Sequence, residues 1–272
     1  MLLFFIITTN YLKFIYDLRY EKRITSCIAS LMLYVLFLPS GENVKHSETK
    51  FTKEKKASKD MVKRIKKAAS YYKNNLIGRT FCFLVDGNTI PVQFKAEHFL
   101  HMCGVDTSLY ARDFYRKAAN GTLHSSEIGF SRQHPYVFAE PKTKNLIKAL
   151  SLFKNDTMFL TCVRTRSKTY PFGITAGGMT LCFDLHLSDT GHPVNGCYVP
   201  YSLRIEDIPK ERYRKAYPID FVLSKDSHAP YCDKIEYGSS NDLADYLDDY
   251  GLDDMKIDDS LFPENDDFDL EL

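Results

Sequence analysis

The sequence lacks the short motifs by which many enzymes bind nucleotides or metals. It contains no GxxxxGK[ST] phosphate loop, no GxGxxG fingerprint, no HExxH pair and no GxSxG nucleophile turn. These absences exclude the best-known sites of nucleotide hydrolases, dehydrogenases, zinc proteases and serine hydrolases. No two of its 7 cysteines have the close spacing of a structural zinc site, and nothing indicates a disulfide framework. A reducing, cytoplasmic setting fits best.

The sequence also has no apolar run long enough to cross a bilayer. Residues 24–38 are almost free of charge, but about 15 residues fall short of the roughly 20 that a spanning helix needs. Residues 1–40 resemble a signal peptide in composition, although the first apolar run precedes the basic cluster. Three interpretations stay open: a membrane-associated helix within residues 1–38, a signal-like segment, or an extension without function.

Aromatic and charged residues are abundant instead. The 19 Phe and 18 Tyr are enough for a packed core. The net charge of +1 hides an asymmetry, because residues 45–79 are rich in Lys and Arg and residues 240–272 are rich in Asp and Glu. Such polarity indicates a basic surface for a polyanion and an acidic tail, although solvated flanks would explain it equally well.

The pattern divides the chain into an apolar segment (1–40), a basic polar linker (41–59), a folded domain (60–237) and an acidic, amphipathic, disordered tail (238–272). Helical spacing of apolar residues predicts a helix over 61–76, with its lysines left for water or phosphate. Further helices are predicted at 109–119 and 142–152, and hairpins around Asp86-Gly87 and Gly177-Gly178. Helices first and strands after predict an α+β fold, with N-terminal helices packed on one face of an antiparallel sheet.

The candidate chemistry centres on residues 94–104, FKAEHFLHMCG, where a predicted hairpin meets a predicted helix. His98 and His101 would share a helix face. Either could act as an acid or base near neutral pH, and a half-buried structural pair is the alternative. A metal site of Asp184, His186, Asp189 and His192 is conceivable, but strand alternation makes the first two ordinary surface residues.

The remaining residues suit metal-free cleavage of a phosphodiester. Arg164 and Lys168, at strand ends, could stabilise charge that builds on a phosphate. The hydroxyls of Thr180, Tyr201 and Ser202 could hold its oxygens. Because RNA supplies its own 2′-OH as nucleophile, such an enzyme needs no covalent residue, no metal and no cofactor.

Residues 94–105, followed by Phe114-Tyr115, resemble the signature F-K-x-E-x-F-x-H-L-x-G of phage-associated nuclease-like domains of the barnase, EndoU, colicin and RelE (BECR) superfamily. Residues 179–183 and 198–203 resemble that family's strand motifs, so the resemblance covers roughly residues 60–237. It implies a BECR-like fold of helices and antiparallel sheet. It also implies a metal-independent ribonuclease, often a toxin or mobile-element effector.

Carried over by position, His101 matches the motif histidine and His98 stands at a variable position. We therefore assign catalysis to His101 and structure to His98. Ser202 matches the serine after the family's proline, while Arg164 and Lys168 are catalytic candidates from strand position alone. Substrate binding is assigned to Lys95, Thr180, Tyr201, Lys63 and Lys67.

These observations predict a cytoplasmic endoribonuclease, with His101 as acid or base and the 45–79 segment binding phosphates in a salt-dependent way. The acidic tail could fold back as an internal inhibitor, and a cognate inhibitor is a further possible partner. The alternative is a non-catalytic nucleic-acid or protein-binding module of a mobile element, with a partner-binding or DNA-mimicking tail. A third hypothesis is a structural protein tethered to a membrane by residues 1–38.

Overall fold

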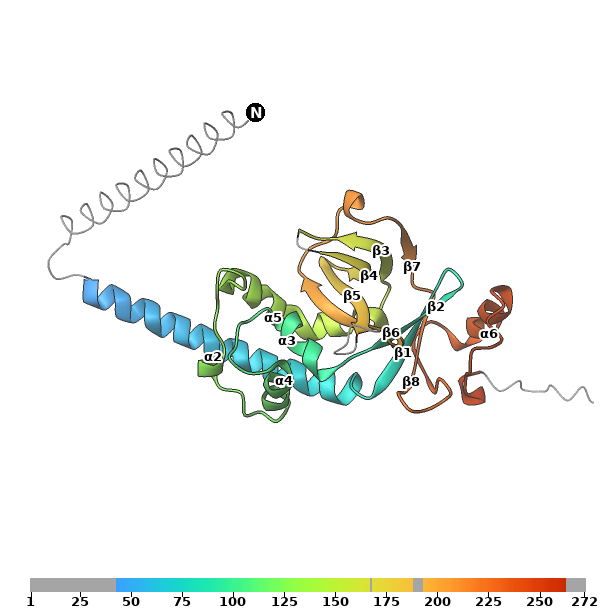
Figure 1. Ribbon diagram of the computed structural model, residues 1–272, viewed down its shortest axis with the longest axis horizontal. Helices are drawn as coiled ribbons and strands as arrows, with labels where there is room; N and C mark the ends of the chain where they lie inside the picture. The colour runs from blue at the N-terminus through green and yellow to red at the C-terminus, as the bar shows by residue number, and fades with distance from the viewer. Residues whose placement is uncertain (1–42, 167, 188–192, 263–272) are drawn as a thin grey trace, which may run out of the picture. The chain divides into compact units, whose positions relative to one another are not determined.

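The structure is a computed structural model that describes residues 43–166, 168–187 and 193–262 (Figure 1). The expectations for residues 1–40 therefore lie outside the described residues. Within these ranges no helix is both long enough and apolar enough to span a membrane. Of two compact units, residues 1–54 and 55–272, the second contains the sheet.

The elements follow the predicted order, with most helices before most strands. The helices are α2 (Asn43–Asn75), α3 (Phe99–Cys103), α4 (Ala111–Ala119), α5 (Tyr136–Leu150) and α6 (Ser240–Asp249), and a short 3-10 helix, η1 (Ala96–His98), precedes α3. The strands are β1 (Arg79–Val85), β2 (Asn88–Gln93), β3 (Met158–Arg164), β4 (Thr169–Ala176), β5 (Met179–Leu187), β6 (Pro193–Arg204), β7 (Ala216–Pro218), β8 (Phe221–Asp226) and β9 (Lys234–Tyr237).

In the described residues the strands form one sheet in the order β7-β3-β4-β5-β6-β2-β1-β8-β9. Neighbouring strands are antiparallel, except for a parallel pairing of β2 with β6 through Val92 and Tyr198. The α+β fold with a mostly antiparallel sheet is therefore confirmed.

Both predicted hairpin turns are present. Asp86 and Gly87 have φ of 48° and 71°, and Gly177 and Gly178 have φ of 56° and 75°. Positive φ at both central residues is typical of the primed turns that match the right-handed twist of a hairpin. These two turns set the register of β1 against β2 and of β4 against β5.

The apolar stripe of α2 packs on the sheet as predicted. Met61, Ile65 and Tyr72 are fully buried in the main core. The Tyr72 hydroxyl donates to the carbonyl of Lys95 at 2.9 Å and so anchors the start of η1. The helix begins at Asn43, so most of the segment expected as a linker is helical.

Helix α5 also begins earlier than predicted, at Tyr136 instead of residue 142. Pro141 lies inside this helix, although proline lacks an N–H and disfavours a helix interior. The carbonyl that loses its partner belongs to Val137, whose side chain is 66% exposed, so water can satisfy it in the first turn. The proline is therefore tolerated inside the helix.

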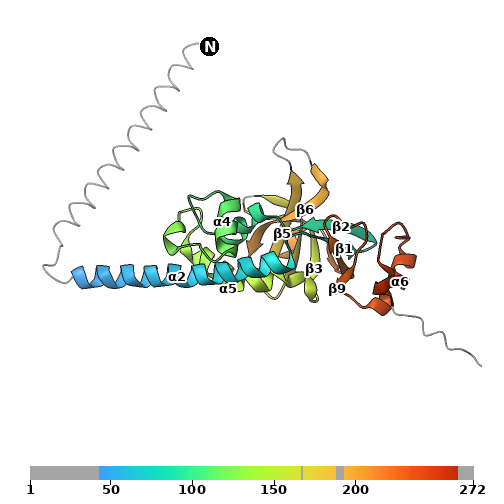
Figure 2. The same cartoon turned by 90° about the horizontal axis from the view of Figure 1, so that it is seen from below.

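Both faces of β1 are buried, which requires a layer on each side. Phe81 and Phe83 point to the core shared with α2 and α5, and Cys82 and Leu84 point to a second core shared with α6. Figures 1 and 2 show α6 beyond β1, away from α3 and α4. Within the acidic segment expected to be disordered, residues 240–249 form α6, which is amphipathic as expected and buries Leu243 and Leu247.

Candidate functional site

A β-bulge places Tyr201 at the centre of the candidate site. In the pairing of β5 with β6, Cys182 lies opposite Ser202 and Phe183 lies opposite Pro200, so Tyr201 is the extra residue. A bulge re-aims the side chain it carries and is common next to active sites. Tyr201 packs at the border of a third apolar cluster that includes Tyr170.

His101 stacks on this tyrosine. The centroids of the two rings are 5.3 Å apart and the ring planes differ by only 9°. Helix α3 buries Phe99 and Met102. It ends at Cys103 and is capped by Gly104, whose φ of 66° is in the left-handed region that such a cap needs. Because those residues anchor the helix, the His101 side chain remains exposed on its outer face.

Lys168 lies over the same tyrosine, with its Nζ 4.3 Å from the Tyr201 ring centroid and 5.5 Å from that of Tyr170. Its ammonium forms an ion pair with Asp184, and this hydrogen bond raises the pKa of Lys168. Burial raises the pKa of Tyr170, and the nearby Ser202 hydroxyl lowers it in part. His101, Tyr201, Lys168 and Ser202 are therefore brought together.

Two further cations were not identified from the sequence: Lys142 of α5 lies near His101, and Arg204 of β6 lies near Lys142 and Tyr170. Burial lowers the pKa of Lys142, and the charge of Arg204 lowers it further. Within the described ranges neither side chain forms an ion pair, and Arg204 Nε is buried without a hydrogen-bond partner. Partly buried cations that no carboxylate neutralises favour the binding of an anion.

Lys142 is positioned by the end of α3. A Cβ built on Gly104 would lie 2.8 Å from Lys142 Cδ, so the absence of a side chain at Gly104 lets the lysine stem cross the helix end. The glycine signals a helix cap in the sequence, but no local pattern indicates which distant side chain passes over it.

The surroundings of His101 favour its neutral form. Partial burial of the ring lowers its pKa most, followed by the positive charges of His134 and Lys142. His134 itself is held by an ion-pair contact between its Nδ1 and Asp106 Oδ1. A neutral imidazole is the form that can accept a proton, and a second histidine near it could supply one.

His98 has a different environment. Burial lowers its pKa to about 4, and its ring lies edge-on to that of His186 with centroids 6.0 Å apart. Its Nδ1 is buried, with no hydrogen-bond partner among the residues that the structure describes. His98 is therefore neutral at pH 7, and its surroundings favour the structural assignment.

The depressed pKa of His98 predicts a loss of stability in acid. In the unfolded chain His98 binds a proton below its ordinary pKa of about 6.5. In the folded chain it does so only below about pH 4. The free energy of unfolding should fall by about 3 kcal/mol between these values because of this group alone. Urea unfolding of wild type and His98→Asn across this pH window measures it, and an identical acid loss in the variant would contradict the assignment.

Several predicted site residues lie elsewhere. Arg164 donates to the carbonyl of Glu211, and Thr180 is fully buried with its hydroxyl donating to the carbonyl of Glu206 at 2.9 Å. The side chains of Lys63 and Lys67 are exposed on α2. Lys95 lines a separate hollow, and two members of the conceivable metal set, Asp189 and His192, lie outside the described residues.

Comparison with protein families gives a match that covers the candidate site. A family model described as phage-Barnase-EndoU-ColicinE5/D-RelE like nuclease4 matches residues 64–240, well over half of the chain. No curated protein and no solved structure matches this chain. The matched range starts within α2 and ends at the first residue of α6, so it includes the candidate site but little of α6.

Proposed function

Because the chain belongs to this phage-associated family of Barnase-EndoU-ColicinE5/D-RelE like nucleases, we propose that it is a metal-independent endoribonuclease. The observation that carries the proposal is the stack of His101 on Tyr201 next to Lys168, Lys142 and Arg204. It combines a neutral imidazole, an aromatic platform and cations in one place.

In the proposed reaction, neutral His101 accepts the proton of a ribose 2′-OH. The 2′-oxygen forms a bond to the adjacent phosphorus, and the bond from phosphorus to the 5′-oxygen breaks. His134, oriented by Asp106, donates the proton that the leaving 5′-oxygen needs. The products are a 2′,3′-cyclic phosphate and a free 5′-OH, so no water is consumed and no metal is required.

The cations supply the electrostatic part of the proposed mechanism. Lys142 and Arg204 stabilise the extra negative charge on the pentavalent phosphate. Ser202 holds an outer oxygen, and Lys168 holds another once its ion pair with Asp184 opens. Tyr201 offers a ring surface for a base, which stacks on aromatic side chains regardless of sequence. The fully buried Thr180 and the backbone-bound Arg164 are left out of this set.

Substrate recruitment is assigned to the exposed lysines of α2, including Lys63 and Lys67. Contacts of lysine with phosphates release counterions, so binding should weaken steeply with salt and depend little on sequence. The enzyme would act in the cytoplasm as a toxin or effector of a mobile element, with a cognate inhibitor as its natural antagonist.

A site-specific 2′-deoxy substitution tests the chemistry. We expect the full chain to cleave a single-stranded RNA in EDTA and to leave a 2′,3′-cyclic phosphate, and to spare the linkage whose 2′-OH is replaced by hydrogen. Cleavage at the deoxy linkage would refute attack by the 2′-OH. Binding of both oligonucleotides without cleavage would favour the non-catalytic nucleic-acid-binding module.

A further inference from the structure

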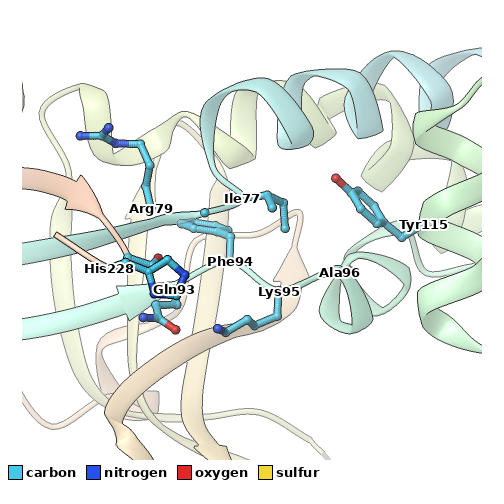
Figure 3. A pocket seen from close by; sticks show the side chains of 10 residues that line it. Ile77, Arg79, Gln93, Phe94, Lys95, Ala96, Tyr115 and His228 are labelled. Atoms are coloured by element: carbon cyan, nitrogen blue, oxygen red, sulfur yellow. The ribbon is translucent and has the colours of Figure 1, made fainter.

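A hollow lies apart from the His101–Tyr201 stack, where β1, β2 and α4 meet the loop after β8. It has a volume of about 370 Å³. Figure 3 shows part of its lining, including Ile77, Gln93, Lys95, Ala96, Tyr115 and His228. Pockets for small ligands measure about 300–1,000 Å³, so this one suits a ligand near the lower limit of that range.

The charged groups of the hollow are of one sign, because none of the described residues that line it is acidic. Arg79 is engaged elsewhere: its guanidinium donates to Ser224 and pairs with Asp233, and in Figure 3 its side chain points away from Lys95. No carboxylate within the described ranges forms an ion pair with Lys95. Lys95 is therefore the cation of the hollow that is available to a ligand.

The polar and apolar parts of the hollow are at opposite ends. Lys95 extends toward Gln93 and His228, and the Tyr115 ring closes the other end near Ile77 and Ala96 (Figure 3). Gln93 is held in place by its amide, which donates to Thr80 at 2.9 Å. Tyr115 is held by edge contacts to the rings of Tyr72 and Phe99, at 5.6 and 5.5 Å between centroids.

We propose that this hollow binds one nucleotide unit. Its base lies against Tyr115 at the apolar end, and its phosphate is bound by Lys95 with His228 and the Gln93 amide at the polar end. A planar apolar group joined to an anion matches this arrangement, because aromatic side chains stack bases and a lysine binds phosphate as a point charge. The nucleotide comes either from the free pool or from a single-stranded RNA chain.

The position of the hollow favours the RNA chain as the source, and this part of the inference rests on the proposed function. His101 lies six positions after Lys95 in the chain, along η1 and α3. At a rise of about 1.5–2 Å per residue their backbones are on the order of 10 Å apart. That separation corresponds to about three nucleotides of a stacked strand. One strand could therefore occupy both sites.

Equilibrium binding to the folded full chain tests the proposal, with AMP, adenosine, inorganic phosphate and a four-nucleotide RNA as probes at low salt. AMP should bind more tightly than adenosine or phosphate alone. Lys95→Gln should weaken AMP binding by about tenfold or more, since a charge-assisted hydrogen bond is lost. Lys148→Gln, which removes an exposed lysine of α5 outside the hollow, should leave it unchanged. Photolabelling with 8-azido-AMP should modify peptides that contain Tyr115 or His228.

The outcomes separate this site from the catalytic one. His101→Ala should bind AMP as wild type does even if cleavage is lost. AMP binding therefore tests the nucleotide site, and cleavage tests the proposed catalysis, independently of each other. If the RNA binds more tightly than AMP and this difference is lost in Lys95→Gln, the RNA strand is the source of the nucleotide. If the RNA and AMP bind equally, the free nucleotide is the source. Should Lys95→Gln misfold, His228→Ala, which truncates an exposed side chain, must weaken AMP binding instead. Unchanged AMP affinity in a folded Lys95→Gln, or labelling elsewhere, overturns the proposal.

Discussion

His101→Ala should lower kcat/KM for RNA cleavage by about 10²–10⁴-fold, the range for loss of a general acid or base. This corresponds to about 3–5 kcal/mol of transition-state stabilisation. The expected effect is large because the ring combines a lowered pKa with a fixed position against Tyr201. Initial rates of cleavage of a labelled RNA in EDTA, at equal amounts of folded protein, measure it.

The fold should survive this substitution. His101 is exposed, whereas Phe99, Met102 and Cys103 supply the buried side of α3. His124→Ala is the matched control, because His124 is also an exposed histidine but lies outside the site. Equal activity of wild type and both variants would remove His101 from the mechanism. It would also leave His134 with Asp106 as the remaining candidate for proton transfer near the cations.

Leu243→Ala should destabilise the protein by about 2–5 kcal/mol, as for other buried leucines. Leu243 of α6 is fully buried in the second core, together with Leu84 and Leu223. Its loss leaves a cavity between α6 and the sheet. A loss of about 3 kcal/mol lowers the melting temperature of a domain of this size by roughly 6–12 °C. Thermal unfolding followed by circular dichroism measures the shift.

The matched control is Asp245→Asn, which changes an exposed residue of the same helix. It should shift the melting temperature little, because surface substitutions usually alter stability by less than about 0.5 kcal/mol. If Leu243→Ala has the same melting temperature as wild type, α6 does not contribute to the core.

The packing of α6 also affects how autoinhibition by the acidic tail is tested. Deleting residues 240–272 would remove part of the core, so charge reversal on α6 is the cleaner test of an inhibitory tail.

Much of the fold followed from local patterns. The stripe of Met61, Ile65 and Tyr72 predicted how α2 docks, and Asp86-Gly87 predicted the first hairpin, because both depend only on neighbours in sequence. The boundaries were less predictable. The apolar character of both faces of β1 is visible in the sequence, but the helix that covers its second face comes from residues 240–249, where acidic composition suggested disorder.

The sequence by itself determined the α+β class, the hairpins, the family and the choice of His101 as the candidate acid or base. Only the tertiary structure decided what surrounds that imidazole. It re-aims Tyr201 through a bulge, brings Lys142 and Arg204 together, buries Thr180, and moves Lys95 to a separate hollow. The physical reason is that periodicity and turn chemistry act over a few residues. The charge, burial and register of a site depend on which distant strands and helices come into contact.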